Sequence, residues 1–223
     1  MNDYRMNSYG NYPLTLEGTS ENTASLLAKV LGITALGFLI TAFGVATAPA
    51  WGTFVGFIAV IGLIFAINMT RRQSPMVALG LFLFLAYFMG WEIGPLVQRY
   101  IRTFGISMVF NAAATTGCGM AVMGCISYLF SINYRRVAGI GFAALIVLVI
   151  AGIASMFFHF LSPDTYSWLT LGVFSLLTVA DFARIRAGGD GASATMLALS
   201  IYLDGINIFL AVLQLMGGRR SRD

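Results

Sequence analysis

Charge is what this sequence has least of. Only 10% of its 223 residues are Asp, Glu, Lys or Arg, whereas about 25% are charged in an average soluble domain. A soluble protein of this size covers its surface with polar groups, so the composition excludes an ordinary soluble enzyme and a disordered chain. Hydrophobic residues make up 58%. The composition predicts an all-α integral membrane protein, and the length suits about seven spans of about 20 residues.

Cysteine, histidine and lysine are also scarce, and each scarcity excludes a class of protein. The two cysteines, Cys118 and Cys125, would lie about 10 Å apart along a helix, which is too far for a disulfide. A secreted disulfide scaffold is therefore excluded. His159 is the only histidine, which argues against a His-based metal site or catalytic triad. Lys29 is the only lysine, so there is no Lys-rich patch to bind nucleic-acid phosphates and no lysine in the last helix for a retinal.

Apolar runs separated by prolines, arginines and polar turns predict seven membrane spans. They are too long for the strands of a membrane barrel, which need about 10 residues. The N-terminal residues lack the apolar core of a signal peptide. We therefore expect a disordered polar tail over residues 1–24, one membrane domain over 25–217 and a short basic tail over 218–223. The predicted spans are residues 25–48, 51–69, 75–97, 104–132, 137–160, 166–183 and 192–216.

Basic residues between the spans indicate the orientation. Cytoplasmic loops of membrane proteins are enriched in Lys and Arg, so the distribution favours a cytoplasmic N-terminus in the inner (plasma) membrane. If the last segment did not cross, eleven basic residues would lie on one side of the membrane and two on the other. Charge alone therefore does not exclude a topology with six spans. The length and apolarity of that segment favour crossing. With seven spans, one side holds eight basic residues (Arg5, Lys29, Arg71, Arg72, Arg135, Arg136, Arg184 and Arg186) and the other five (Arg99, Arg102, Arg219, Arg220 and Arg222).

Three acidic residues lie inside these apolar segments. A carboxylate near the bilayer centre costs about 3 kcal/mol, so such residues usually face the interior of a helix bundle. Asp204 lies well inside the seventh segment, Asp181 near the end of the sixth, and Glu92 towards the end of the third. These acids are the leading candidates for functional residues.

Asp181 and Asp204 are candidates for a carboxyl pair, because a short turn joins their two helices. Counting from Gly189, they differ by roughly 10 Å in depth, unless the seventh helix begins late or is tilted. Two carboxyls that close would share a proton. Arg71 or Arg72, at the end of the second helix on the same membrane face, could then hold the pair in a charged, closed form.

Other interpretations of these residues stay open. Asp181 could instead form an interfacial ion pair with Arg184 or Arg186. Glu92 could face water at a helix end or lie at the mouth of a pore. Asn207 could link helices or line a polar path.

The last apolar segment resembles the last helix of the Bax inhibitor-1 family, also called the transmembrane Bax inhibitor motif-containing family. The similarity lies in residues 200–217. Three shorter blocks are also similar to that family: Met69–Arg72, Gly90–Pro95 and Asp181–Ile185. The residues that carry the match in the last helix are Tyr202, Leu203, Asp204, Ile206, Asn207 and Phe209.

This resemblance implies a bacterial member with seven helices and the last helix central in the bundle. It further implies a pH-sensitive calcium leak in which Asp181 and Asp204 are the sensor and make transient contact with calcium. Arg72, or else Arg71, would be the arginine that latches the closed state. The sequence departs from the family pattern at Gly205, Arg184 and Glu92.

Two functions follow as hypotheses. The first is a cation leak gated by the aspartate pair, with the lipid bilayer and calcium ions as partners and no cofactor. The alternative is a non-conducting regulator of a membrane-bound quality-control protease or other membrane complex. Such a regulator needs only an exposed tail or helix face, and the polar N-terminal tail is the feature that would distinguish it. We expect no catalytic residues, because the Gly-x-Gly-Asp of intramembrane aspartyl proteases is missing from the helices.

Overall fold

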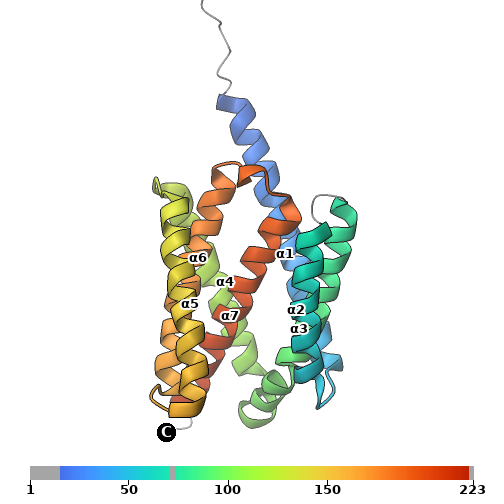
Figure 1. Ribbon diagram of the computed structural model, residues 1–223, viewed down its shortest axis with the longest axis vertical. Helices are drawn as coiled ribbons and strands as arrows, with labels where there is room; N and C mark the ends of the chain where they lie inside the picture. The colour runs from blue at the N-terminus through green and yellow to red at the C-terminus, as the bar shows by residue number, and fades with distance from the viewer. Residues whose placement is uncertain (1–15, 71–73, 221–223) are drawn as a thin grey trace, which may run out of the picture.

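The computed structural model describes residues 16–70 and 74–220, and all their regular elements are helices. Seven of these helices are long and apolar enough to cross a membrane, α7 among them. The predicted all-α membrane fold with seven spans is confirmed. The elements are α1 (Leu16–Thr47), α2 (Gly52–Thr70), α3 (Pro75–Phe104), α4 (Ile106–Leu129), α5 (Tyr134–Phe158), α6 (Pro163–Arg186), a 3-10 turn η1 (Gly189–Gly191) and α7 (Ala194–Arg220) (Figure 1).

α1, α3 and α7 extend beyond their predicted segments. α3 continues through Gln98, whose side-chain nitrogen donates to the carbonyl oxygen of Val45 at 2.8 Å. It ends only at Gly105, whose φ of 85° is unfavourable for other residues. α1 begins at Leu16 and α7 continues to Arg220, both beyond the predicted segments.

Polar residues between the apolar runs start the next helix. The Ser162 hydroxyl accepts a hydrogen bond from the backbone N–H of Thr165 at 3.1 Å, and Pro163 occupies the first helical position. Ser74 and Asn133 cap α3 and α5 in the same way. These caps satisfy backbone groups that a helix cannot satisfy itself.

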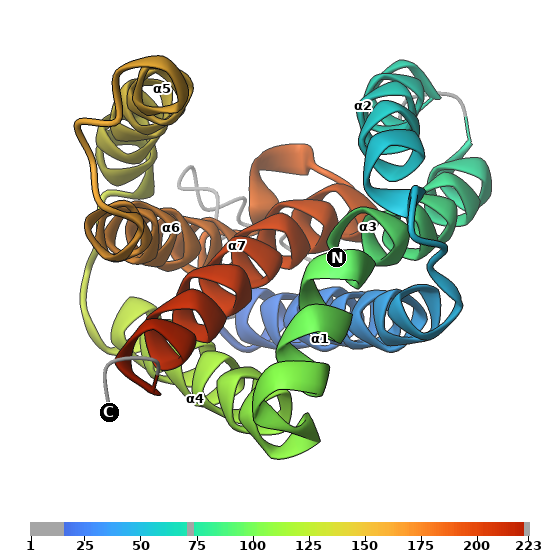
Figure 2. The same ribbon diagram turned by 90° about the horizontal axis from the view of Figure 1, so that it is seen from below.

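α7 is the central helix of the bundle. It packs against α1, α3, α4 and α6, and its share of buried residues is the highest of the seven spans. Figures 1 and 2 show α7 crossing the middle of the molecule, with α5 on the outside of α6 and α2 on the outside of α3. The central position expected for the last helix is confirmed.

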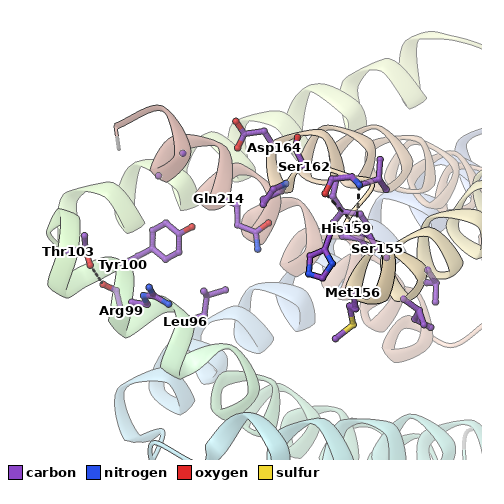
Figure 3. Close-up of a pocket in the computed structure, with 18 of the residues that line it drawn as sticks. Leu96, Arg99, Tyr100, Thr103, Ser155, Met156, His159, Ser162, Asp164 and Gln214 are labelled. Atoms are coloured by element: carbon purple, nitrogen blue, oxygen red, sulfur yellow. Dashed lines mark hydrogen bonds between the residues drawn. The ribbon is translucent and has the colours of Figure 1, made fainter. Parts of the chain in front are cut away.

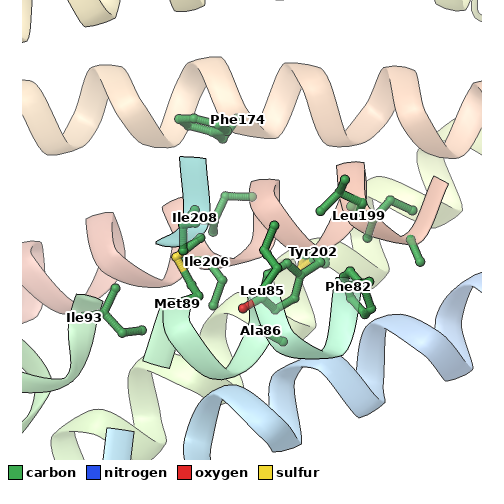
Figure 4. Close-up of a cluster of buried hydrophobic side chains, with 14 of the residues drawn as sticks. Phe82, Leu85, Ala86, Met89, Ile93, Phe174, Leu199, Tyr202, Ile206 and Ile208 are labelled. Carbon is green, nitrogen blue, oxygen red and sulfur yellow. The ribbon is translucent and has the colours of Figure 1, made fainter. Parts of the chain in front are cut away.

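Tyr202 anchors α7 in the apolar core (Figure 4). Its side chain is fully buried, and its ring centroid lies 5.3 Å from those of Phe38 and Phe82. Its hydroxyl shares a 2.5 Å hydrogen bond with the hydroxyl of Thr41 on α1. This packing fixes the depth of α7, and with it the depth of Asp204 two residues further on.

The outside of the bundle is apolar. Large side chains such as Phe54 on α2, Phe110 on α4 and Val147 on α5 are more than three-fifths exposed. A surface of this kind suits contact with lipid, as the seven apolar spans require.

Candidate functional site

Asp204 is buried inside the membrane-spanning part of α7. Its side chain is 5% exposed, and its Oδ2 lies 3.2 Å from the hydroxyl of Thr178 on α6. That hydroxyl also lies 2.8 Å from the carbonyl oxygen of Phe174. A carboxyl with one shared hydroxyl partner in a low-dielectric interior is costly, so it points to a function rather than to stability.

Asp181 lies beside Asp204 on the seam between α6 and α7. The two carboxyls are within electrostatic range of each other, and the Ser200 side chain of α7 is a hydrogen-bond partner of Asp181. α7 begins only at Ala194, two residues later than the predicted segment. Of the predicted site residues, these two aspartates are the ones the fold brings together.

Polar side chains continue along the α6–α7 seam away from the aspartates. The Ser167 hydroxyl donates to Oε1 of Gln214 at 2.8 Å across the two helices. On α6, Ser167, Thr170, Thr178 and Asp181 fall on one helical face, because their separations are close to whole turns. The sequence reading missed this polar line, although the spacing on α6 was a signal for it.

A cavity of about 1260 Å³ opens at the far end of the seam. Figure 3 shows Arg99 and Tyr100 of α3 facing His159, which follows the last residue of α5, with Gln214 of α7 between them. Asp164 at the start of α6 also lines it. The cavity therefore connects the polar seam with the end of the bundle at which α3 and α7 finish.

Glu92 lies on another helix than the aspartate pair, whereas Asn207 lies on α7, three residues after Asp204. Glu92 is half-buried within α3 rather than at its end, and its carboxyl is within electrostatic range of the Tyr202 hydroxyl. The Asn207 side-chain nitrogen donates to the carbonyl oxygen of Leu203 at 2.8 Å on its own helix.

The arginines around Asp181 have different surroundings. Arg71 and Arg72 lie outside the described residues. α2, which precedes them, packs on α3. Arg186 donates to the carbonyl oxygen of Phe130 at 2.6 Å, at the end of α4. Arg184 is within electrostatic range of Asp181, but in residues 16–70 and 74–220 no ion pair joins them.

The oxygen atoms of the seam limit what it can bind. Within the described part of the chain, no three His, Cys, Asp or Glu side chains are grouped to hold a metal ion. Carboxylate and hydroxyl oxygens are the ligands that calcium prefers, and a resident site takes six to eight of them. Two carboxyls and two hydroxyls suit a passing cation or a proton better than a resident ion.

Comparisons with known proteins place this chain in a family. The family model described as "Inhibitor of apoptosis-promoting Bax1" matches residues 23–221. A protein of Borreliella burgdorferi is 28% identical over 218 residues, covering 87% of this chain and 92% of that protein. An uncharacterized membrane protein of Streptococcus pyogenes serotype M3 is 27% identical and covers 70% and 69%. A Helicobacter pylori protein is also 27% identical and covers 76% and 73%.

Proposed function

Because this chain belongs to the Bax inhibitor-1 family of multi-pass membrane proteins, we propose that it is a pH-sensitive cation leak. Calcium is the transported ion, and Asp181 and Asp204 on the α6–α7 seam control it. The observation that carries the proposal is the burial of Asp204 inside a membrane span, with a second carboxyl in electrostatic range. Intramembrane acids that face a bundle interior are typical of ion and proton paths.

The polar seam supplies a route for the ion. A calcium ion needs oxygen ligands to replace its water, and the seam offers Asp181, Ser200, Asp204 and Thr178 at one end. The hydroxyl of Ser167 and the amide of Gln214 continue towards the 1260 Å³ cavity. Phe174 lies between these two polar stretches and is 9% exposed. In this proposal Phe174 closes the route at rest.

Proton binding supplies the gate. Two interacting carboxyls take up protons in steps that belong to the pair, so a change in pH changes the net charge of the seam. A change in buried charge shifts an equilibrium between two helix arrangements only if the two states differ in affinity for the proton. The latch role of Arg72, or of Arg71, stays a prediction, because both lie outside the described residues.

Calcium flux into sealed vesicles tests the proposal. The purified full-length protein is reconstituted with a calcium-sensitive dye inside, and the external pH is varied between about 5 and 8, where perturbed carboxyls titrate. Asp204→Asn and Asp181→Asn should each give a flux that no longer changes with pH. Asp190→Asn is the matched control, because it removes a carboxyl from the exposed connection between the same two helices.

The outcome separates the leak from its alternative. A flux that keeps its parental pH profile in both seam variants would refute the aspartate gate. If the parental protein carries no calcium at all, the leak is refuted. Loss of a cellular phenotype on deletion of residues 1–22 would then favour the regulator of a membrane-bound protease.

A further inference from the structure

A second, apolar site lies on the other side of α7, away from the aspartate seam. Figure 2 shows α1 and α4 on the same flank of α7, and both pack against it. Two cavities of about 850 and 520 Å³ lie between them and share Phe38, Gly117 and Met120 in their linings. Together they form one groove, called here the α1–α4 groove, with α7 as its floor.

We propose that the α1–α4 groove binds one anionic phospholipid from the bilayer leaflet at the α3–α4 connection. The acyl chain lies in the groove, and the phosphate binds Arg102. This site is separate from the proposed leak, since neither carboxyl of the aspartate pair lines the groove.

The polar atoms of the groove explain why an acyl chain fits its interior. The hydroxyl of Thr116 donates to the Ala112 carbonyl oxygen at 2.8 Å, and that of Thr41 lies 3.0 Å from the Ala86 carbonyl oxygen. The Thr34 hydroxyl donates to the carbonyl oxygen of Ala198 at 3.4 Å. These three threonine hydroxyls are satisfied internally, so this part of the lining offers an occupant mainly apolar contact.

The length of the larger cavity matches one leaflet. Its α4 lining runs from Ile106 to Met120, a rise of roughly 20 Å at 1.5 Å per residue. Half of a bilayer's hydrocarbon core is about 15 Å thick. A chain that enters at the Ile106 end therefore reaches past the bilayer midplane near Phe38 and Met120.

Arg102 gives the groove its charge preference. It is the one charged residue in the lining of either cavity, it is exposed in the last turn of α3, and no ion pair joins it to another residue of 16–70 or 74–220. A guanidinium binds a phosphate through paired, charge-assisted hydrogen bonds. In a zwitterionic lipid the cationic amine of the headgroup repels the Arg102 guanidinium and weakens its attraction to the phosphate. An anionic lipid lacks that amine, so it is favoured.

Gly117 allows the groove to be filled without disturbing the fold. It lines both cavities, and a Cβ built on it would meet no atom within 4 Å. Gly119, on the same helix, also has open space around it but lines neither cavity. Gly117→Leu therefore blocks the groove, and Gly119→Leu is its matched control. Arg99 lines the other cavity, so Arg99→Gln is the control for Arg102→Gln.

Native mass spectrometry of the full-length protein in detergent tests the site. Phosphatidylglycerol and phosphatidylcholine are titrated separately onto the parent and the four variants. We expect a first phosphatidylglycerol to bind the parent more tightly than phosphatidylcholine. Its affinity should fall by about tenfold in Arg102→Gln, the loss expected for one charge-assisted contact. The affinity should also fall in Gly117→Leu, because the new side chain occupies the groove. Both control variants should bind as the parent does.

A second measurement uses the two free cysteines of α4. Cys125 lines the groove and Cys118 does not, while both are exposed. Added phosphatidylglycerol should slow the reaction of Cys125 with a membrane-soluble thiol reagent and leave Cys118 unchanged. Equal lipid affinity in all five proteins would overturn the proposal. So would a protein dimer that Gly117→Leu disrupts without any effect of lipid, because a second copy would then occupy the groove.

Discussion

Asp190 links two connections of the bundle that are far apart in the sequence. It lies in the turn between α6 and α7 with a φ of 53°. The Tyr134 hydroxyl at the start of α5 donates to its Oδ2 at 2.6 Å, and the guanidinium of Arg135 lies 3.4 Å from Oδ1. The hydrogen bond from Tyr134, helped by the charge of Arg135, lowers the pKa of the Asp190 carboxyl below its usual value.

This lowered pKa predicts a pH-dependent effect of Asp190→Asn. A carboxyl whose pKa is lower in the folded state stabilises the protein above its unfolded pKa, about 3.9. That contribution is lost as the pH falls through the folded pKa. Asn tolerates the same backbone conformation. The variant should therefore unfold at a lower temperature than the parent at pH 7, and the difference should narrow as the pH approaches about 3.

Thermal unfolding of the detergent-solubilised protein across this pH range measures the effect. Tyr134→Phe should reproduce part of the loss at pH 7, because it removes the closest donor to Asp190. Parallel pH profiles for the parent and Asp190→Asn would contradict the prediction.

The acids of the site could be found from the sequence, but their hydroxyl partners could not. A carboxylate within an apolar run is costly enough that few exist without a reason, so Asp181 and Asp204 were conspicuous. A hydroxyl in a helix satisfies itself on the carbonyl oxygen four residues back, as Thr178 does with Phe174. The free-energy cost of a hydroxyl inside a span is therefore small, so hydroxyl residues are not conspicuous in the sequence. Only the fold identifies Thr178 as the partner of Asp204.

At the scale of the elements, glycines set how closely the helices approach. A Cβ built on Gly90 of α3 would lie 2.7 Å from the Cα of Gly44 on α1 and would also collide with the Thr41 carbonyl oxygen. On the other side of α3, a Cβ on Gly56 of α2 would lie 2.7 Å from the Phe88 carbonyl oxygen. α3 is thus held between α1 and α2 by backbone contacts that leave no space for a side chain.

We predict opposite effects for the same substitution at two positions of α3. Gly90→Ala should destabilise the protein by about 1–3 kcal/mol, because the atoms it meets are backbone and cannot move aside. Gly80→Ala should be neutral or stabilising by up to about 1 kcal/mol, because a Cβ there meets nothing within 4 Å. Denaturant unfolding in detergent measures both, and equal stability of the two variants would contradict the prediction.

The existence of each helix could be predicted from the sequence more accurately than its ends. A long apolar run in a membrane protein predicts a transmembrane helix, because in lipid every backbone group must be hydrogen-bonded within the segment and a helix achieves this. The end of α3 was misplaced because Gln98 is polar, yet its amide binds the carbonyl oxygen of Val45 on α1. Such a tertiary contact is invisible in a hydropathy pattern. The GxxxG spacing of Gly52 and Gly56, and of Gly90 and Gly94, is typical of close helix packing, but the spacing alone does not say which helix each pair meets.

At the scale of the whole molecule, the central place of α7 joins the two proposed sites. One face of α7 carries Asp204 towards α6, and its Gly205 lies on the floor of the α1–α4 groove. A Cβ on Gly205 would lie 2.6 Å from the Phe38 ring, so the missing side chain makes room for that ring. In the two proposals taken together, a movement of α7 changes the seam and the groove at once, so lipid bound in the groove would bias the proposed proton-dependent equilibrium.

The basic residues on the two sides of the seven spans predict the orientation of the bundle in the membrane. The connection between α4 and α5 lies at the same end as the start of α1, and the connection between α1 and α2 lies at the other. Counted along the sequence, the segments assigned to the first side hold eight basic residues and those assigned to the second hold five. Retention of Lys and Arg in the cytoplasm predicts that the α4–α5 connection is cytoplasmic and the α1–α2 connection is not.

Single cysteines in the two connections test this orientation. In a Cys118→Ala, Cys125→Ala background, Ala50→Cys and Ser131→Cys place one thiol at an exposed position in each connection. A membrane-impermeant maleimide should label Ala50→Cys on intact cells and Ser131→Cys only after permeabilisation. The reverse pattern would mean that other forces than loop charge orient the chain. Three helices, α2, α3 and α4, separate the two sites, so the seven-span fold puts them on opposite sides of the membrane. Labelling of both thiols on intact cells would contradict that arrangement, and with it the seven-span fold.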